Sequence, residues 1–534
     1  KDNLEILKTS VNKIEGVQIF DRSETAEAMI EIVKGDFNYI LIVSSLIVFI
    51  TLLLIYGRIE LALLAFIPMV ISWIWILGIA ALLGIKFNFV NIVISTFIFG
   101  LGDDFSIFIT DGLLAKYKYK KESLSSYKTA ILLSAATTII GTGVLFFAEH
   151  PAIKSVAIIS VLGIVCILII SLIFQPVLFN IFVQNRVDNQ KSPITAITLL
   201  NSLIGYIVFI GGCLFNNIIL LVIYIIPISK RNKKGILNII ISAFGKIVIY
   251  SVPTMRKRIE TLNLDFKEPS IIIANHSSFL DILLMIMLNR KIVLMTNSWV
   301  YKSLLFGFSI QYAGYLFTGD GPEKNLKLIK QRIKEGYSVM IFPEGTRSMD
   351  GKIKRFHKGA FYLSEELELD ISPIVIHGTS YSISKNDFII KSGTISLRAL
   401  PRIKYEDRTW GDGYRSRTKS ISKYFKQEYV KLAEEREDSK YLWQPLFENY
   451  VFKGPILEWY LRIKWKFESK NFEYYNKLIG ARKTILDVGC GYGYLDFYLS
   501  LKNADRVITG IDYDEEKINI AKNSLGKLDS VNFI

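Results

Sequence analysis

The sequence is poor in cysteine and histidine. Its 534 residues include 3 cysteines and 4 histidines. Cys166 and Cys213 lie inside apolar runs and Cys490 lies in a glycine-rich turn, so these thiols provide no disulfide framework. This excludes a disulfide-stabilised secreted domain, and we expect the chemistry of the protein to take place in the cytosol.

Acidic residues are also outnumbered, with 49 Asp and Glu against 64 Lys and Arg and a net charge of +15. Such an excess can indicate nucleic-acid binding, but here the cations cluster beside long apolar runs. Anionic lipid headgroups are the expected partner in that setting. We therefore expect membrane lipids and no nucleic acid. The chain also lacks an initial Met and a signal peptide, and it stops in a strand-like run, so we expect a piece of a longer protein.

Long apolar runs are what the chain has in abundance, and a bilayer is crossed by about 20 such residues. Five spans are predicted between 39 and 183, at 39–56, 61–85, 87–110, 129–148 and 155–183. Lysines concentrate between the third and fourth spans, so the positive-inside rule places residues 114–128 in the cytoplasm. By alternation, residues 1–38 lie outside as the end of an extracytoplasmic domain, and Arg186 and Lys191 lie inside.

A further uncharged run occupies 193–229. It fits a single long helix, a re-entrant segment, or a hairpin that is broken at Gly211, Gly212, Asn216 and Asn217. Both flanks are cationic, with Lys191 before the run and a group of cations at 230–234 after it. The positive-inside rule therefore favours an additional membrane hairpin, which keeps the rest of the chain in the cytosol.

Two adjacent carboxylates interrupt the third span, in the stretch GLGDDFSIF at 100–108. Intramembrane carboxylates are costly and usually mark ion or proton paths. If the span instead ends at Gly102, Asp103 and Asp104 lie at the interface, but the apolar FSIFIT that follows favours a position inside the span. The stretch resembles the G-x-G-x-D-Y signature of the RND superfamily, in its MMPL-type lipid exporter branch, although Phe105 replaces the tyrosine.

That resemblance covers 1–183 and implies the second half of an exporter, with the N-terminal half of the transporter as its partner. It implies a proton relay at Asp104, which matches the signature, and secondarily at Asp103, which aligns with a variable position. The loss of the tyrosine hydroxyl at Phe105 puts a relay through that group in doubt.

The region 235–431 alternates strand-like runs with helical ones, which predicts an α/β domain. In NHSSFLD, His276 is followed by Asp281, and a carboxylate that orients an imidazole makes it a competent general base near neutral pH. Alone, this spacing is equally consistent with a capped helix and a polar edge histidine. The turn FPEGTRS at 342–348 supplies donors and a guanidinium that suit an anion.

These two motifs, with FHKGA at 356–360 and ISPIVI at 371–376, resemble the glycerolipid acyltransferase family, typified by 1-acylglycerol-3-phosphate acyltransferases. The resemblance implies that His276 deprotonates an acceptor hydroxyl while Asp281 holds the imidazole, and that no metal is needed. Acyl-CoA or acyl carrier protein would be the donor. It also implies a substrate-binding role for four residues of the turn, which are Glu344, Gly345, Thr346 and Arg347.

One family motif departs from its pattern. An arginine that binds the acceptor phosphate usually follows a glycine-aromatic strand, but AGYLFTGDG at 313–321 has Gly319 near that position and Asp320 beside it. Lys324 or Lys327 would then replace the arginine, or the acceptor carries no glycerol phosphate.

After a charged and aromatic linker at 432–469, the stretch TILDVGCGYG runs from a strand into a glycine turn, and Asp512 ends the next strand. A glycine turn followed by such a carboxylate suits a nucleotide. The stretch resembles class I S-adenosylmethionine-dependent methyltransferases, with NAD binding as the alternative. The resemblance covers 470–534, a truncated domain, and assigns S-adenosylmethionine to Asp487, Gly489, Gly491, Gly493 and Asp512.

The sequence thus predicts a multi-domain protein: an α-helical transmembrane bundle, an α/β acyltransferase domain and a partial Rossmann-like α/β methyltransferase domain. We expect a bacterial inner membrane location with the two α/β domains in the cytoplasm. The combination resembles proteins of aryl polyene and flexirubin-type pathways. Two alternatives stay open, namely an exporter with an accessory acyltransferase and ordinary phosphatidic acid synthesis.

Overall fold

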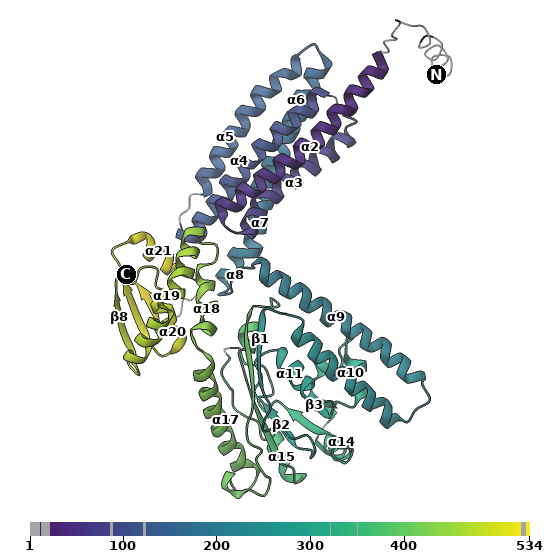
Figure 1. The fold of residues 1–534 in the computed structure, drawn as a ribbon, viewed down its shortest axis with the longest axis vertical. Coiled ribbons are helices and arrows are strands. Elements are labelled where there is room, and N and C mark those ends of the chain that lie inside the picture. The colour runs from purple at the N-terminus through teal and green to yellow at the C-terminus, as the bar shows by residue number, and fades with distance from the viewer. Residues whose placement is uncertain are drawn as a thin grey trace. The chain divides into compact units, whose positions relative to one another are not determined.

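The structure is a computed structural model that describes residues 11, 16, 22–85, 89–120, 124–320, 322–349, 351–524 and 530–534. The chain divides into two compact units (Figure 1). The first comprises 1–193 together with 446–534, and the second comprises 194–445. The sequence predicts that residues 1–38 are the end of an extracytoplasmic domain. Of these, 1–21 lie outside the described residues except for 11 and 16, and 22–38 belong to the first long helix.

The first unit begins with a bundle of long helices: α2 (Arg22–Tyr56), α3 (Ile59–Leu82), α4 (Phe89–Tyr119), α5 (Leu124–Gly143) and α6 (Pro151–Ile169). The last of these continues through η2 (Ile170–Phe174), α7 (Gln175–Phe179), η3 (Asn180–Gln184) and α8 (Asn185–Asp188). Five apolar helices are thus confirmed in this region. By length and composition, Tyr39–Tyr56, Ile59–Leu82, Leu124–Phe147 and Pro151–Asp188 are able to cross a membrane, as is Ala196–Ile225 in the second unit.

Polar side chains inside this bundle bond to neighbouring helices. Ser106 of α4 donates to the carbonyl of Ala65 in α3. Gln175 donates through Nε2 to the Ser106 carbonyl at 2.9 Å and to Thr110 Oγ1 at 2.6 Å. Because such groups have no water to bond within a bilayer, these contacts fix how α4 packs against its neighbours.

The region 193–229 differs from the prediction. A single helix, α9 (Ala196–Ile225), runs through it without interruption, so the predicted hairpin break at 211–217 is wrong. The chain instead reverses after α9 and continues in α10 (Lys230–Tyr250), which packs beside α9 (Figure 1).

Two of the residues that suggested a break, Gly212 and Asn217, have packing roles. A Cβ on Gly212 would lie 2.1 Å from the Phe244 ring of α10, so glycine permits close approach of the two helices. Asn217 donates to the Leu305 carbonyl at 2.7 Å and accepts from Ser309 Oγ at 2.8 Å. Glycine within a helix costs roughly 0.5–1 kcal/mol relative to alanine, and packing of this kind offsets it.

α9 also contacts the α/β domain near its beginning, where Asn201 accepts from Thr254 Oγ1 at 2.9 Å and Ser202 Oγ accepts from the Ile390 amide at 2.8 Å. A helix of 30 residues is about 45 Å long, enough to cross a bilayer. Because α9 contacts the α/β domain at Asn201, Ser202 and Asn217, this part of the helix lies along that domain in this structure.

The second unit contains a seven-stranded sheet in the order β1-β7-β6-β2-β5-β3-β4. Neighbouring strands are parallel except for the antiparallel pair β6–β7. The strands are β1 (Met255–Glu260), β2 (Ile271–Ala274), β3 (Ile292–Thr296), β4 (Leu316–Phe317), β5 (Ser338–Ile341), β6 (Ile371–His377) and β7 (Gly393–Ala399). The predicted α/β fold is confirmed.

Helices cover both faces of this sheet, which is needed because its central strands are buried on both sides. The helices are α10, α11 (Leu280–Leu288), α12 (Ser298–Tyr301), α13 (Gly307–Ala313), α14 (Pro322–Lys334), α15 (Gly359–Glu366), α16 (Thr379–Ser382) and α17 (Tyr414–Arg436). All four residues of β2 are buried, and this strand leads directly into the NHSSFLD motif.

The C-terminal part of the first unit is a three-stranded parallel sheet in the order β10-β9-β8. Its elements are α19 (Pro455–Ile479), β8 (Thr484–Val488), α20 (Tyr494–Lys502), β9 (Val507–Ile511), α21 (Glu515–Lys522) and β10 (Val531–Phe533). The predicted linker at 432–469 is largely helical, since it includes the end of α17, α18 (Ser439–Phe447) and much of α19.

Candidate active site

The loop between β2 and α11 carries the candidate catalytic residues, and Asn275 fixes its start. The Asn275 amide donates to the Ile376 carbonyl and accepts from the Ile376 amide, both at 2.8 Å. These two hydrogen bonds to β6 resemble the pairing of neighbouring strands. They place the next residue, His276, at the carboxyl edge of the sheet. Open α/β sheets usually bind ligands at this edge.

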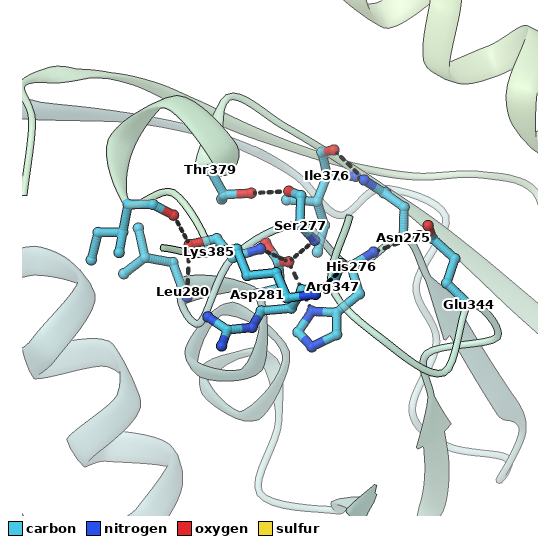
Figure 2. A network of polar contacts seen from close by, with 12 residues as sticks. Asn275, His276, Ser277, Leu280, Asp281, Glu344, Arg347, Ile376, Thr379 and Lys385 are labelled. Carbon is cyan, nitrogen blue, oxygen red and sulfur yellow. Dashed lines mark hydrogen bonds and ion pairs between the residues drawn. The ribbon is translucent and has the colours of Figure 1, made fainter. Parts of the chain in front are cut away.

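His276 and Asp281 meet in the structure (Figure 2). His276 Nδ1 lies 3.0 Å from Asp281 Oδ2. The imidazole stacks on the Phe342 ring at 4.0 Å between centroids and 15° between planes. The side chain of His276 is 12% exposed, whereas that of Asp281 is fully buried. The histidine is thus held from two sides, with Nε2 left as the ring nitrogen for a substrate.

The buried carboxylate of Asp281 is well compensated. Its Oδ2 also accepts the backbone amides of Ser277 and Ser278, each at 2.7 Å. Hydrogen bonds from backbone N–H groups stabilise the charged form of a carboxylate in a dry site. Ser277 and Ser278 are themselves fixed, through Thr379 Oγ1 and the Ile383 carbonyl. An ionised Asp281 can therefore orient Nδ1–H and stabilise the imidazolium that forms during proton transfer.

Glu344, which the motif assigns to substrate binding, holds the protein backbone here. Its two carboxylate oxygens accept the amides of His276 and Lys354, both at 2.8 Å. Burial raises the pKa of Glu344 above its ordinary value, and the two amide bonds oppose that shift. The side chain joins the FPEGTRS turn to the histidine loop, and a third bond reinforces the junction, from the Ser348 amide to the His276 carbonyl at 2.8 Å.

The rest of the turn lies at the surface of the site. Gly345 has a φ of +70°, a left-handed conformation that favours glycine. The carbonyl of Arg347 accepts from both Lys354 Nζ and Lys385 Nζ at 3.1 Å, so two lysines lie beside the turn. Figure 2 shows Arg347 and Lys385 near the histidine loop. Thr346 Oγ1 accepts from Lys354 Nζ at 3.3 Å. The arrangement suits an anionic group of a substrate.

A cavity of about 970 Å³ opens beside this turn. Its walls are mainly apolar side chains from α9, α10, α11 and the loop before α13, among them Phe209, Val252, Leu283 and Phe306. Arg347 lines the same cavity. An apolar cavity of this size with a few polar groups is typical of small-molecule and lipid sites.

Sequence reasoning missed several residues of this site. Asn275 lies within the quoted motif, but its bond to Ile376 depends on the pairing of β2 with β6. Lys385 is 38 residues beyond Arg347, in a loop without a recognisable pattern. Phe342 is part of the FPEGTRS motif, yet its stacking on His276 has no signal in the sequence.

The two membrane carboxylates point in different directions. Asp104 is exposed on the surface of the bundle. Asp103 is half-buried, and its Oδ1 has no hydrogen-bond partner among the described residues. Consecutive helical residues are about 100° apart, so both cannot face the same neighbour.

The glycine turn has room for a nucleoside cofactor such as S-adenosylmethionine. Gly489 and Gly491 have left-handed φ values of +81° and +58°, and among the described residues no atom lies within 4 Å of a Cβ built on either. Asp512 follows β9, and its Oδ2 accepts the Gly491 amide at 2.7 Å. Asp487, the penultimate residue of β8, lies beside the buried Asp496, and burial together with Asp487 raises the pKa of the Asp496 carboxyl above its ordinary value. Sequence reasoning missed Asp496.

Comparison with known proteins matches each part separately. An acyltransferase family model covers 254–377, an MMPL family model covers 16–193, and a methyltransferase domain model covers 479–534. Similar curated proteins include the 1-acyl-sn-glycerol-3-phosphate acyltransferases of Chlamydomonas reinhardtii, 31% identical over 149 residues, and of Arabidopsis thaliana chloroplasts, 30% identical over 148 residues.

These alignments cover 26% and 27% of this chain and 45% and 41% of the respective relatives, so the chain spans less than half the length of both. The solved 1-acyl-sn-glycerophosphate acyltransferase of Thermotoga maritima is 21% identical, with a TM-score of 0.39 over 44% of this chain and 95% of that one. The chain therefore combines, in this order, a segment of the MMPL family, an acyltransferase domain and part of a methyltransferase domain.

Proposed function

We propose that the second unit transfers an acyl group from a thioester, on coenzyme A or acyl carrier protein, to a hydroxyl of a glycerolipid-like acceptor. The observation that carries this proposal is the 3.0 Å contact between His276 Nδ1 and a buried Asp281 that accepts two backbone amides. The names of the similar curated proteins support an acceptor of this class.

In the proposed mechanism, His276 Nε2 takes the proton from the acceptor hydroxyl while Asp281 stabilises the imidazolium. The acceptor oxygen attacks the thioester carbonyl carbon and forms a tetrahedral intermediate. When the C–S bond breaks, the thiolate leaves and the imidazolium returns the proton to sulfur. The products are an oxygen ester and a thiol, and His276 is regenerated. The apolar cavity would hold an acyl chain, and Arg347 would bind an anionic substrate group.

His276→Ala tests the mechanism in purified, lipid-reconstituted protein. Loss of a general base typically lowers the rate by about 10²- to 10⁴-fold, so acceptor-dependent thiol release should fall by that factor. His357→Ala is the matched control, because His357 is exposed and we assign it no part in the reaction. If His276→Ala released thiol at the wild-type rate, the mechanism would be contradicted. The domain would then be interpreted as a lipid-binding module.

We also propose a bacterial inner membrane location with this domain in the cytoplasm, because its thioester donors are cytosolic. Membrane lipids would then surround the protein and also supply its acceptor substrates. The departure at Gly319 and Asp320 bears on the acceptor: Lys324 Nζ pairs with Asp320 at 2.8 Å, so it is already engaged by a carboxylate. Comparing acceptors with and without a phosphate in the thiol-release assay decides whether the phosphate is required.

Lipid export is a second candidate function, favoured by the MMPL match over 16–193. Asp104 is the proposed relay residue because it fits the family signature, and its exposed position leaves it accessible to a surface such as the transporter's N-terminal half. Asp104→Asn should block outward movement of the acylated lipid without affecting its synthesis, and Asp103→Asn should have the milder effect. Fractionation of inner and outer membranes measures the outward movement of the lipid in both variants. Normal movement in Asp104→Asn would mean that residues 16–193 serve only as a membrane anchor.

The methyltransferase part would hold S-adenosylmethionine through the glycine turn at 489–493, with Asp512 on the ribose hydroxyls and Asp487 nearby. The cofactor would supply an electrophilic methyl group. A link to aryl polyene or flexirubin-type lipids rests on the order of the domains, and mass analysis of lipids lost in a deletion strain tests it.

A further inference from the structure

Residues 447–458, which we term the docking segment, connect α18 to α19 within the first unit and lie against the ends of the membrane helices. Arg58, in the turn between α2 and α3, donates through Nε to both carboxylate oxygens of Glu458, at 3.0 and 2.8 Å. The two side chains are 14% and 7% exposed. A largely buried pair of this geometry is directional, and removal of one partner is strongly destabilising.

A backbone amide and two aromatic rings surround this ion pair. Glu458 also accepts the Phe452 amide at 2.9 Å, and the Arg58 guanidinium lies over the rings of Phe447 and Phe452. Gly57 permits the approach, because a Cβ there would lie 2.6 Å from Pro455 Cβ.

The docking segment also contacts the end of α4. The buried Tyr117 hydroxyl donates to the Val451 carbonyl at 2.9 Å. Lys453 is fully buried, and its Nζ lies 2.9–3.0 Å from three acceptors, which are Ile520 O, Asn523 O and Ser524 Oγ. These acceptors lie at the C-terminal end of α21. The segment is therefore bonded to α4 on one side and to the methyltransferase fold on the other.

A third contact reaches the glycine turn itself. Tyr450 is fully buried, and its hydroxyl donates to the Tyr492 carbonyl at 2.7 Å. The neighbouring Gly491 amide is the donor to Asp512 Oδ2. A continuous series of contacts thus runs from Tyr117 in α4 through residues 450–451 to the turn and to Asp512.

We propose that the docking segment couples the membrane helices to the nucleotide site of the methyltransferase fold. A nucleotide that engages Asp512 and the Gly491 amide must replace the bond between them, which shifts the turn that Tyr450 holds. Val451, the next residue, is bonded to α4. Coupling of this kind is reciprocal, so movement of α4 would in turn change the nucleotide site. The inference is independent of acyl transfer.

The geometry favours coupling over simple packing, because the bonds are made to main-chain atoms. Tyr117 donates to the Val451 carbonyl and Tyr450 to the Tyr492 carbonyl. Each hydrogen bond therefore depends on the position of the main chain. Apolar packing alone would tolerate small shifts, whereas a directed hydrogen bond weakens steeply when its angle changes.

Hydrogen exchange on the full chain in lipid nanodiscs tests the proposal without a ligand. Tyr117→Phe keeps the ring and removes only the bond to Val451. We expect amides at 487–494 to exchange about five-fold faster, the equivalent of about 1 kcal/mol for one hydrogen bond. Tyr474→Phe is the control, since Tyr474 is an exposed tyrosine on α19. Unchanged exchange at 487–494 in Tyr117→Phe would overturn the coupling.

Tyr450→Phe provides the reverse measurement, with faster exchange expected at 112–119 in α4. The last arm adds S-adenosylmethionine. In the wild type it should slow exchange at 112–119 as well as in the glycine turn, and Tyr450→Phe should weaken the distant effect, since α4 also bonds to α21 directly through Lys118 and Tyr119. If no slowing appears at 112–119 in the wild type, the segment is a structural support and the proposed coupling to the nucleotide site is wrong.

Discussion

Replacement of Asp281 by asparagine is the sharpest test of the catalytic loop, because it changes one charge and almost no volume. In the structure Oδ2 accepts three donors, namely His276 Nδ1 and the amides of Ser277 and Ser278. Oδ1 is buried without a hydrogen-bond partner among the described residues. The asparagine amide oxygen must therefore take the place of Oδ2, which leaves its NH₂ group in the buried position.

The magnitudes follow from that geometry. A buried donor without a partner costs about 1–3 kcal/mol, so the free energy of unfolding should fall by this amount. Hydrogen bonds to a charged group contribute about 1.5–3 kcal/mol, and the variant loses the charge that stabilises the imidazolium. We expect kcat to fall by about 10- to 150-fold, less than for His276→Ala, because the imidazole keeps its position between Phe342 and a neutral acceptor.

The assay is acceptor-dependent thiol release, with thermal unfolding measured on the same samples. Ser372→Ala serves as the stability control, because it removes a buried hydrogen bond to Ser270 Oγ at 3.0 Å away from the imidazole. That variant should lose stability but keep kcat. If Asp281→Asn retained wild-type kcat, or if Ser372→Ala lost as much activity, the role of the carboxylate in the reaction would be refuted.

Three other predictions concern the rest of the chain. Gly212→Val should destabilise the packing of α9 on α10 by about 1–3 kcal/mol in thermal unfolding, whereas Gly211→Ala, with open space at its Cβ, should be neutral or slightly stabilising. A reporter after Lys234 should report the cytoplasm, as should one inserted between α4 and α5, and an outside signal at either point would contradict the proposed orientation. Burial, aided by Lys118, lowers the pKa of Lys453 from an ordinary 10.5 to about 7. Since the unfolded chain then binds a proton that the folded chain lacks, stability should rise between about pH 7 and 10.5, and Lys453→Met should remove that rise in melting temperature.

The features that the sequence predicted well are local ones. His276 and Asp281 are five residues apart, and the boundary between a buried strand and an apolar helix is visible from composition alone. A loop that reverses onto the first turn of a helix then brings the two side chains together. The alternation of strands and helices likewise comes from short-range patterns, and it correctly indicated an α/β domain.

What the sequence could not predict depends on long-range pairing. The bond between Asn275 and Ile376 joins residues 101 positions apart and requires β2 to lie beside β6. The family resemblance implies that Glu344 binds substrate, and this stays a prediction. Its bonds to two backbone amides could not be predicted, because they depend on how β5 is placed next to β2.

The region 193–229 shows how a valid rule led to an incorrect shape. Cations on both flanks require both ends to lie on one side of the membrane, and a hairpin is the simplest apolar solution. In the structure one uninterrupted helix, α9, bonds to the α/β domain at Asn201, Ser202 and Asn217, and the chain reverses only before α10. Glycine and asparagine were interpreted as helix breakers, yet Gly212 admits Phe244 and Asn217 binds the loop before α13. A polar residue in an apolar helix can either break the helix or bind a partner, and the sequence does not distinguish the two. Here the partner lies in the α/β domain. Closer to its beginning, α9 lines the apolar cavity with Gly205, Tyr206, Phe209 and Ile210, so this helix contributes to the proposed acyl site.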